Sequence, residues 1–370
     1  MKVLEIKQDM YKFDDTDFQP HGGGQPADRG KIKSKSFEGN VLDVTKEDSK
    51  IWHKIEITKG ELKKGDEVKA EIDMPRRMKL TKMHTGEHIL FKALQTFLPD
   101  LELDKIRLDE DESSLFVIMP NLDWDVAFKA EELANKIIFE NKEVILHKVL
   151  KEKANEFKGL RIKAERIKEP EIKVIEIKDF DFSACTGTHC KTTKEIGSLI
   201  ITHLRSSGPG KYELRFKVDN LKEFLEFSKL SRQGMDILGT ERDKFIVTLN
   251  NLKENYEKFK KQAREATINQ EIEKEEFNGI EFYFHIFEDA DKKQLTDKAN
   301  SVMKENTYVA FVNKTEKGNQ LLLFGKKAGD LMQTLLKELN GRGGGKDRFA
   351  MGQFDKTAEE LISRTKRLIA

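Results

Sequence analysis

The sequence has only two cysteines among 370 residues, Cys185 and Cys190, which argues against a disulfide-rich secreted fold. It has no apolar run near the roughly 18 residues of a membrane-spanning helix, and its amino end, MKVLEIKQDM, is too charged for a secretory signal. It also has almost no excess charge, since 67 Lys and Arg residues face 66 Asp and Glu residues. We therefore expect a cytoplasmic protein without membrane contact, in which any nucleic-acid contact comes from local basic patches.

The chain is longer than a single hydrophobic core normally supports, so several domains are expected. The patterns predict an α+β protein. Short β segments separated by turns predict a small β-barrel-like domain, and mixed helices and strands predict an α+β domain after it. Helical periodicity then predicts an arm, and alternating strands and amphipathic helices predict a C-terminal α/β domain. The four expected segments are residues 1–75, 76–217, 218–275 and 276–370.

The expected arm contains an apolar seam with alternating spacings of four and three residues from Phe245 to Ala266. Extended back to Met235, it predicts a helix of about 35 residues, or about 50 Å. The segment 221–230 would form a separate helix, because Gly234 and Gly239 weaken the join. Two interpretations remain open: dimerisation of two chains through the seam, or pairing of the two helices in a hairpin.

Two Cys/His pairs with four-residue spacing are the strongest chemical signal. His84 and His88 lie in HTGEH, within a helical pattern, and Cys185 and His189 lie in CTGTH after an expected strand. Residues four apart share one helix face, and tetrahedral zinc is bound by this set of side chains. The spacing predicts one Zn²⁺ per chain. Cys190 is an alternative sulfur ligand, but Cys185 is preferred because it matches the spacing of the first pair.

Two glycine-rich segments offer backbone groups to a ligand. Residues 21–30, HGGGQPADRG, contain three successive glycines that permit close ligand approach, or else simply form a flexible hairpin loop. Residues 340–354, NGRGGGKDRFAMGQF, are expected to form a loop that presents N–H groups and positive charge to phosphate. Asn340 and Gly341 in that segment are equally consistent with the end of a helix.

Together, GGGQPADRG, HTGEH, CTGTHCKTTKEIG and GRGGGKDRF resemble alanyl-tRNA synthetase and the free-standing AlaX editing proteins along nearly the whole chain. The chain looks like a long-type AlaX protein, since nothing before the β domain would bind ATP and alanine. The resemblance implies hydrolysis of the ester that joins serine, and also glycine, to alanine tRNA. It also implies that His84, His88, Cys185 and His189 are the zinc ligands.

The resemblance places further residues at the site. Gln25 and Thr16 match positions near the misattached amino acid, where a polar side chain would bind the serine hydroxyl. Glycines 22 to 24 (Gly22, Gly23 and Gly24) would line the acyl site through backbone groups. Candidate tRNA-binding cations are Lys191, Lys194, Arg205, Lys211, Arg215, Arg342, Lys346 and Arg348; the first five are equally consistent with a solvated sheet face.

This chain departs from the family pattern at three positions. His21 stands where a small or acidic residue is more usual, Gln19 replaces an aromatic residue, and Thr186 replaces the usual glycine after Cys185. The first two departures bear on serine selectivity, and the third on the flexibility of the Cys185 loop. None of them changes the four expected ligands.

Other functions fit parts of the sequence. A closed four-ligand zinc is typically structural, which would make this a non-catalytic tRNA-binding protein. HTGEH also matches the HxxEH signature of zinc peptidases, with Glu87 as the base; we expect Glu87 to face away from the ligand pair and to be structural. A related His/Cys layout occurs in threonyl-tRNA editing domains, but GGGQ and GRGGG favour alanine tRNA.

Overall fold

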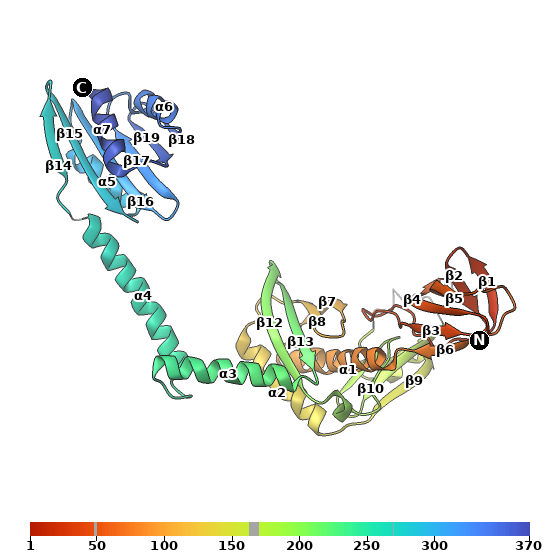
Figure 1. The fold of residues 1–370 in the computed structure, drawn as a ribbon. Helices are drawn as coiled ribbons and strands as arrows, with labels where there is room; N and C mark the ends of the chain where they lie inside the picture. Colours follow the sequence, from red (N-terminus) through yellow and green to blue (C-terminus); the bar gives the residue numbers. More distant parts are fainter. Residues whose placement is uncertain (48–49, 163–169, 269) are drawn as a thin grey trace. The chain divides into compact units, whose positions relative to one another are not determined.

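The fold is that of a computed structural model, which describes residues 1–47, 50–162, 170–268 and 270–370, with side chains of 264–268 excluded. The chain forms two compact units, Met1–Ser231 and Arg232–Ala370. Both contain helices and sheets (Figure 1), so the expected α+β class is confirmed. Within the described residues, no helix is long and apolar enough to cross a membrane.

The first unit begins with a six-stranded antiparallel sheet in the order β1-β2-β5-β4-β3-β6. Its strands are β1 (Val3–Lys7), β2 (Met10–Phe13), β3 (Gly30–Lys33), β4 (Glu38–Glu47), β5 (Lys50–Lys59) and β6 (Lys69–Ile72). The edges approach at an isolated bridge between Lys2 and Glu67, beside which Val3 N–H donates to Asp66 O and Val68 N–H donates to Met1 O. In the described residues no continuous ladder closes the sheet, so the expected barrel is an open sheet. The glycine-rich segment lies between β2 and β3.

Helix α1 (Met74–Phe97) carries both histidines of HTGEH. It begins where the Asp73 carboxylate accepts a hydrogen bond from the Arg76 N–H, which satisfies one of the free donors of the first turn. Its middle is buried on all sides, from Leu80 to Leu94. A helix enclosed in this way holds its polar side chains at fixed positions inside the protein, which is a requirement for a rigid site.

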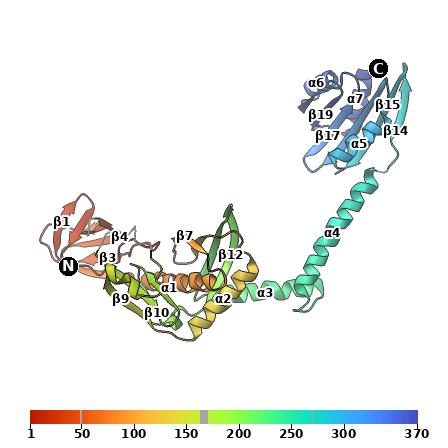
Figure 2. The ribbon, with the colours of Figure 1, turned by 180° about the vertical axis from the view of Figure 1, so that it is seen from behind.

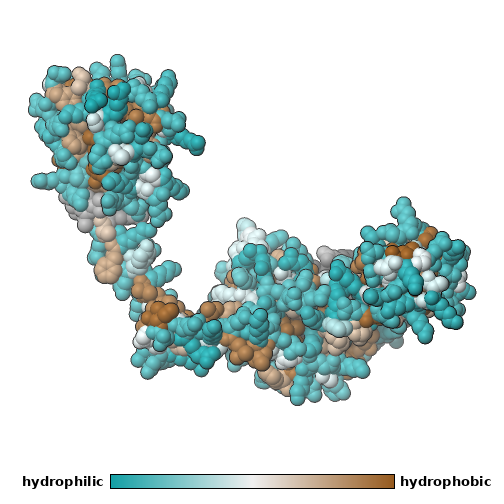
Figure 3. All heavy atoms as spheres, in the orientation of Figure 1, coloured by the Kyte–Doolittle hydropathy of each residue, from teal (hydrophilic) through white to brown (hydrophobic). Residues whose placement is uncertain are grey.

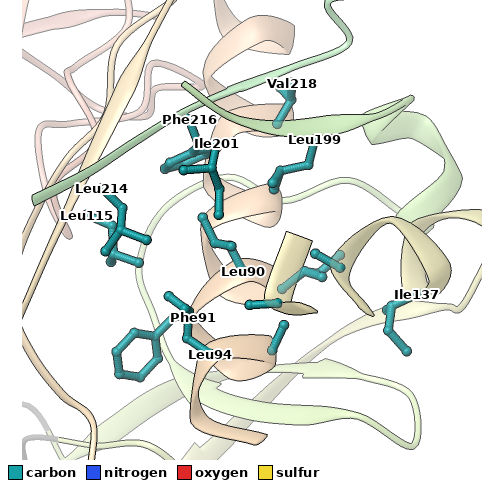
Figure 4. Close-up of a cluster of buried hydrophobic side chains, with 14 of the residues drawn as sticks. Leu90, Phe91, Leu94, Leu115, Ile137, Leu199, Ile201, Leu214, Phe216 and Val218 are labelled. Atoms are coloured by element: carbon teal, nitrogen blue, oxygen red, sulfur yellow. The ribbon is translucent and has the colours of Figure 1, made fainter. Parts of the chain in front are cut away.

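Two further sheets and helix α2 (Trp124–Phe139) surround α1 in the first unit. The four-stranded sheet has the order β12-β13-β8-β7, and the three-stranded sheet has the order β11-β10-β9. Leu90, Phe91 and Leu94 of α1 pack with residues of α2, β8, β12 and β13 in one core (Figure 4). The strands are β7 (Glu102–Arg107), β8 (Ser113–Ile118), β9 (Val144–Leu150), β10 (Glu171–Ile177), β11 (Asp181–Ala184), β12 (Leu199–Gly208) and β13 (Lys211–Val218), with short helices η1 (Lys151–Glu156) and η3 (Thr193–Ile196).

The expected long helix is divided differently. Helix α3 (Leu221–Leu238) continues through Gly234 and ends before Gly239, which has a positive φ of 58°, and α4 (Phe245–Ile268) follows. The seam side chains on α4 are exposed, including Tyr256 at 61% and Phe259 at 68%. Apolar residues are visible along these helices in Figure 3. The side chain of Ala266 lies outside the described residues.

The second unit contains a six-stranded sheet in the order β14-β15-β16-β17-β19-β18. Along β16, Ala310 and Val312 face a core with α6 and α7, while Val309 and Phe311 face a core with α5. The two faces are seen in Figures 1 and 2. The elements are β14 (Glu273–Phe277), β15 (Ile280–Glu288), α5 (Lys292–Val302), β16 (Thr307–Thr315), β17 (Gly318–Phe324), α6 (Ala328–Glu338), β18 (Arg342–Lys346), β19 (Phe349–Phe354) and α7 (Ala358–Ile369).

The second glycine-rich segment is not a loop. Its glycines form β18, an exposed edge strand that pairs antiparallel with β19. Gly345 lies against β19 so closely that an added Cβ would be 2.3 Å from Ala350 Cα. The glycines therefore serve close strand packing, and Arg342 and Lys346 mark the two ends of the strand.

Candidate metal centre

Four side chains from two distant parts of the sequence converge beside α1. His84 and His88 project from α1, and Cys185 and His189 come from the loop that follows β11. One ligand atom from each lies within 4.8 Å of the others. Cys185 Sγ is 3.2 Å from His84 Nε2 and 3.5 Å from His189 Nε2. Such a group could hold a metal ion. Cys190, the alternative sulfur, is buried outside this cluster.

The second ring nitrogen of two histidines is already engaged. His84 Nδ1 lies 2.8 Å from Gln25 Oε1, and His189 Nδ1 lies 3.3 Å from Thr85 Oγ1. The Thr85 hydroxyl donates to Thr81 O, so its oxygen is available as an acceptor for His189. Both histidines can therefore carry their proton on Nδ1 and present a bare Nε2 to the cluster. His88 Nδ1 is buried without a hydrogen-bond partner in the described structure.

Burial disfavours charge throughout the cluster. Desolvation lowers the pKa of His84 to about 4 and raises the pKa of the Cys185 thiol to about 11. Neutral imidazoles are the form that ligates a metal, and binding of a cation would favour the thiolate and release its proton. Without a metal the four side chains are therefore favoured in their neutral forms, and together they are suited to bind a cation.

A buried ion pair lies next to the cluster. Arg161 Nε donates to Asp181 Oδ1 at 3.0 Å, and the guanidinium lies over the Phe91 ring. Glu87 is also buried, and desolvation raises its pKa to about 7. Glu87 Oε2 is 3.8 Å from His88 Nε2, so the expectation that this side chain faces away from the ligand pair is wrong. Glu87 and His88 are consecutive residues of α1, and their buried side chains lie close together.

The glycine-rich segment of the first sheet lies against the cluster. A Cβ added to Gly23 would be 3.8 Å from both Cys185 Sγ and His84 Cε1, and one on Gly22 would be 3.3 Å from Thr186 Oγ1. The backbone of these two glycines therefore borders the cluster and its loop. Gly24 instead packs on β7, where an added Cβ would be 2.9 Å from Ile106 O.

Gln25 and Thr16, the two polar residues expected near the substrate, have different surroundings. Gln25 is fully buried and contacts both His84 and Thr188. Thr16 Oγ1 is 2.8 Å from Nε2 of the buried His53, within the sheet domain. The structure thus brings Gln25 to the cluster, whereas the bonds of Thr16 link it to the β5 strand.

Contacts that the sequence motifs did not reveal hold the glycine-rich segment on α1. The buried Asp28 carboxylate accepts hydrogen bonds from Arg77 of α1 and from the Gln19 N–H. Gln19 Nε2 also donates to Thr186 O at 3.0 Å. These residues are separated by up to 167 positions, and no short motif encodes such pairings. The ligand-bearing helix, the Cys185 loop and the first sheet thereby form one assembly.

The expected tRNA-binding cations fall into two groups. Arg205 and Arg215 both donate to Glu213, at 2.7 and 3.0 Å, and Lys211 lies 3.9 Å from Asp104. Their charge is therefore partly neutralised within the sheet. The remaining cations are exposed and have no carboxylate partner within the described ranges; they are Lys191, Lys194, Arg342, Lys346 and Arg348.

Two family models match this chain. Residues 1–76 match the class II (A) tRNA synthetases, and residues 172–213 match the second additional domain of threonyl and alanyl tRNA synthetases. The first match covers the open sheet, and the second includes the loop with Cys185 and His189. The class of protein indicated by both is that of the tRNA synthetases and their relatives.

Individual relatives narrow this class. The alanyl-tRNA editing protein AlaX-L of Pyrococcus horikoshii is 27% identical over 98% of this chain and 93% of its own length. The alanine–tRNA ligase of Methanosarcina barkeri is 29% identical over 95% of this chain, which spans 40% of that ligase. The structural match to the C-Ala domain of Aquifex aeolicus alanyl-tRNA synthetase covers 26% of this chain and 97% of that domain, at 16% identity and a TM-score of 0.24. The resemblance to long AlaX proteins is confirmed over nearly the whole chain.

Proposed function

We propose that this protein is a trans-editing hydrolase that deacylates mischarged alanine tRNA. The observation that carries the proposal is the cluster of the buried His84 and His88 with the half-buried Cys185 and His189, bordered by the glycine backbone of the first sheet. Similarity to AlaX-L over 98% of the chain supports it. Deacylation in alanyl-tRNA editing is the activity that agrees with both the cluster and the similarity to AlaX-L.

Zinc is the metal we propose for the cluster, one ion per chain. Tetrahedral zinc with ligand distances near 2.0 to 2.3 Å places a sulfur and a nitrogen ligand about 3.5 Å apart. The Cys185 Sγ to imidazole distances of 3.2 and 3.5 Å fit that geometry. A donor set of three imidazoles and one thiolate is suited to zinc.

The reaction is hydrolysis of an ester. Water adds to the acyl carbon, the bond to the terminal ribose oxygen breaks, and that oxygen takes a proton, which releases the free amino acid and intact tRNA. Zinc, when bound, would supply a Lewis-acidic centre beside the ester. The chain itself would bind and orient the acyl end. The backbone of Gly22 and Gly23 borders the ligands without side chains that would exclude a substrate.

Serine is the proposed amino acid, with glycine as a further substrate. A pocket built for alanine cannot strongly reject an amino acid that adds one hydroxyl or lacks one methyl group, so a second hydrolytic step is needed. Thr16 remains a proposed substrate contact. Its hydroxyl already bonds His53 and accepts a hydrogen bond from the Phe18 N–H, and a serine hydroxyl would be a third partner. Alanine would lack this hydrogen bond.

Mischarged alanine tRNA is the proposed macromolecular partner, in the cytoplasm. Lys191, Lys194, Arg342, Lys346 and Arg348 are the preferred phosphate contacts, because their charges are not held by carboxylates within the described chain. Each phosphate contact would make binding weaken as salt rises. Arg205, Lys211 and Arg215 would first have to exchange their carboxylate partners.

We further propose a homodimer, formed through the apolar seam on α4 or through the C-terminal domain. Leu252, Tyr256 and Phe259 are 54%, 61% and 68% exposed. Seam residues of this kind pack on a second helix when one is available. Sedimentation of the purified chain would give a dimer that dissociates when Leu252 and Phe259 are changed to glutamate. We also propose, from the resemblance to long AlaX proteins, that the boundaries between functional domains lie near residues 75, 217 and 275.

A tRNA-binding protein with a purely structural zinc is the second candidate, because four protein ligands fill a tetrahedral site. The peptidase hypothesis is disfavoured, since Cys185 and His189 join the HTGEH histidines in one cluster. The decisive experiment is deacylation of seryl-, glycyl- and alanyl-charged alanine tRNA, with and without a zinc chelator. Rapid zinc-dependent loss of serine with alanine spared supports editing. Survival of every ester while tRNA still binds supports the structural role.

A further inference from the structure

We propose that Gln25 is a positioning residue, which fixes the His84 imidazole as a metal ligand and does not itself contact the amino acid. The inference rests on the proposed function only in requiring a bound metal. It replaces the expectation that the Gln25 amide recognises the serine hydroxyl. The basis is the hydrogen bonding of a side chain that is 0% exposed, in which the amide oxygen already has two donors.

The orientation of the Gln25 amide is determined by its neighbours. The Thr188 backbone N–H can only donate, and it lies 3.0 Å from Gln25 Oε1. This atom is therefore the carbonyl oxygen, and His84 Nδ1, 2.8 Å from the same atom, must be the donor. The proton of His84 is thus fixed on Nδ1, and Nε2 is left bare toward Cys185 Sγ. A hydrogen bond of this type commonly fixes the tautomer and ring orientation of a metal-bound histidine.

Little of the Gln25 amide remains for a substrate. Oε1 accepts from His84 and Thr188, which uses both of its lone pairs. Nε2 donates to Thr188 Oγ1 at 3.0 Å, and Thr188 Oγ1 in turn lies 2.6 Å from Thr81 Oγ1. One amide hydrogen is unassigned, on a side chain without solvent exposure. These bonds instead join the glycine-rich segment, the ligand helix and the Cys185 loop at the face of the cluster.

The test is zinc affinity of the full-length protein, measured by competition with a chromophoric chelator in the absence of tRNA. Gln25→Met keeps the volume but removes the acceptor, and we expect zinc to bind about 10- to 100-fold more weakly. Gln25→Glu restores an acceptor for His84 and Thr188, and its affinity should stay within about threefold of wild type. The absorption spectrum of the Co²⁺-loaded protein should change in Gln25→Met and be restored in Gln25→Glu.

Gln19→Met is the matched control. Gln19 lies in the same segment and also bridges to the Cys185 loop, through Thr186 O, but it contacts no ligand side chain. Its zinc affinity should match wild type, and circular dichroism of each variant checks the fold. Equal weakening in Gln19→Met and Gln25→Met would overturn the proposal, since segment docking would then be the cause.

Two further outcomes also decide the matter. Unchanged zinc affinity in Gln25→Met, with lost discrimination between seryl and alanyl esters, would assign Gln25 to substrate contact and overturn the proposal. Absence of zinc binding by the wild-type protein would overturn it as well. Conversely, Gln25-dependent zinc binding by a protein that hydrolyses no ester would support this inference while the proposed editing function failed.

Discussion

Gly187 and His84 lie so close that the structure leaves no room for a side chain between them. A Cβ added to Gly187 would be 2.1 Å from His84 Cε1 and 2.6 Å from Gln25 Oε1. Real carbon atoms do not approach this closely, so any larger residue must displace the imidazole or the Cys185 loop. The middle residue of CTGTH is therefore a steric requirement of the cluster, although its own chemistry is inert.

Gly187→Ala should consequently impair metal binding through crowding alone. We expect zinc content after dialysis to fall well below one ion per chain, because His84 can no longer keep its ring beside Cys185 Sγ. Metal analysis by mass spectrometry measures this. Gly344→Ala is the control, since an added Cβ there meets nothing within 4 Å. Full zinc occupancy in Gly187→Ala would refute the steric account.

Cys185→Ala should abolish zinc binding and ester hydrolysis together. Cys185 supplies the one sulfur in the cluster, and its loss removes the only ligand that would carry a negative charge to balance the cation. Zinc stoichiometry and seryl-tRNA deacylation measured on the same sample check this. Cys190→Ala is the control, because that thiol is buried outside the cluster and its loss should leave zinc in place. Unchanged hydrolysis by Cys185→Ala would sink the zinc assignment.

His53 should make stability depend on pH. Burial lowers its pKa to about 4, whereas the unfolded chain binds the proton near pH 6.5. The contribution of neutral, buried His53 to the free energy of unfolding is fully present above about pH 6.5. It declines as pH falls toward 4, by about 3 kcal/mol in total. His53→Gln removes this titration. The difference in Tm between wild type and His53→Gln should therefore shrink from pH 7 to 4, and a constant difference would contradict the account.

The Arg161 and Asp181 pair should show strong energetic coupling. Asp181 is 1% exposed in its side chain, so Arg161→Met would leave a buried carboxylate without its partner. We expect a loss of about 3 to 5 kcal/mol in the free energy of unfolding. The double variant Arg161→Met, Asp181→Leu should recover much of that loss. Urea denaturation of all four proteins measures the coupling, and strictly additive changes would show that the pair contributes nothing special.

Local signals in the sequence carried the predictions that succeeded. Helix α2 (Trp124–Phe139) follows local signals, because Asp123 caps it and its alanines face a core at regular spacing. The spacing of HTGEH and CTGTH indicated which four side chains to bring together, and the fold places them side by side. Each of these signals lies within a single helix or within a motif of five residues.

The failures share a different cause, which is contact between distant residues. The second glycine-rich segment became a strand because β19 offers it a partner, a pairing invisible in its composition. Gln25 bonds Thr188, 163 residues away, and Thr16 bonds His53, 37 residues away; no short motif reveals either partner. Tertiary partners, rather than the residue type, decide what such polar side chains do.

His84 and Cys185 are separated by 101 positions, yet their ligand atoms are 3.2 Å apart. A metal ion bound to both would act as a removable cross-link that closes a long loop of the chain. In the chain-entropy description, a covalent link across about 100 residues restricts the unfolded ensemble by about 4.7 kcal/mol. While the ligands stay bound, the metal would limit the number of conformations that the unfolded chain can adopt. The supply of metal would in this way affect how long the protein persists between its synthesis and its degradation.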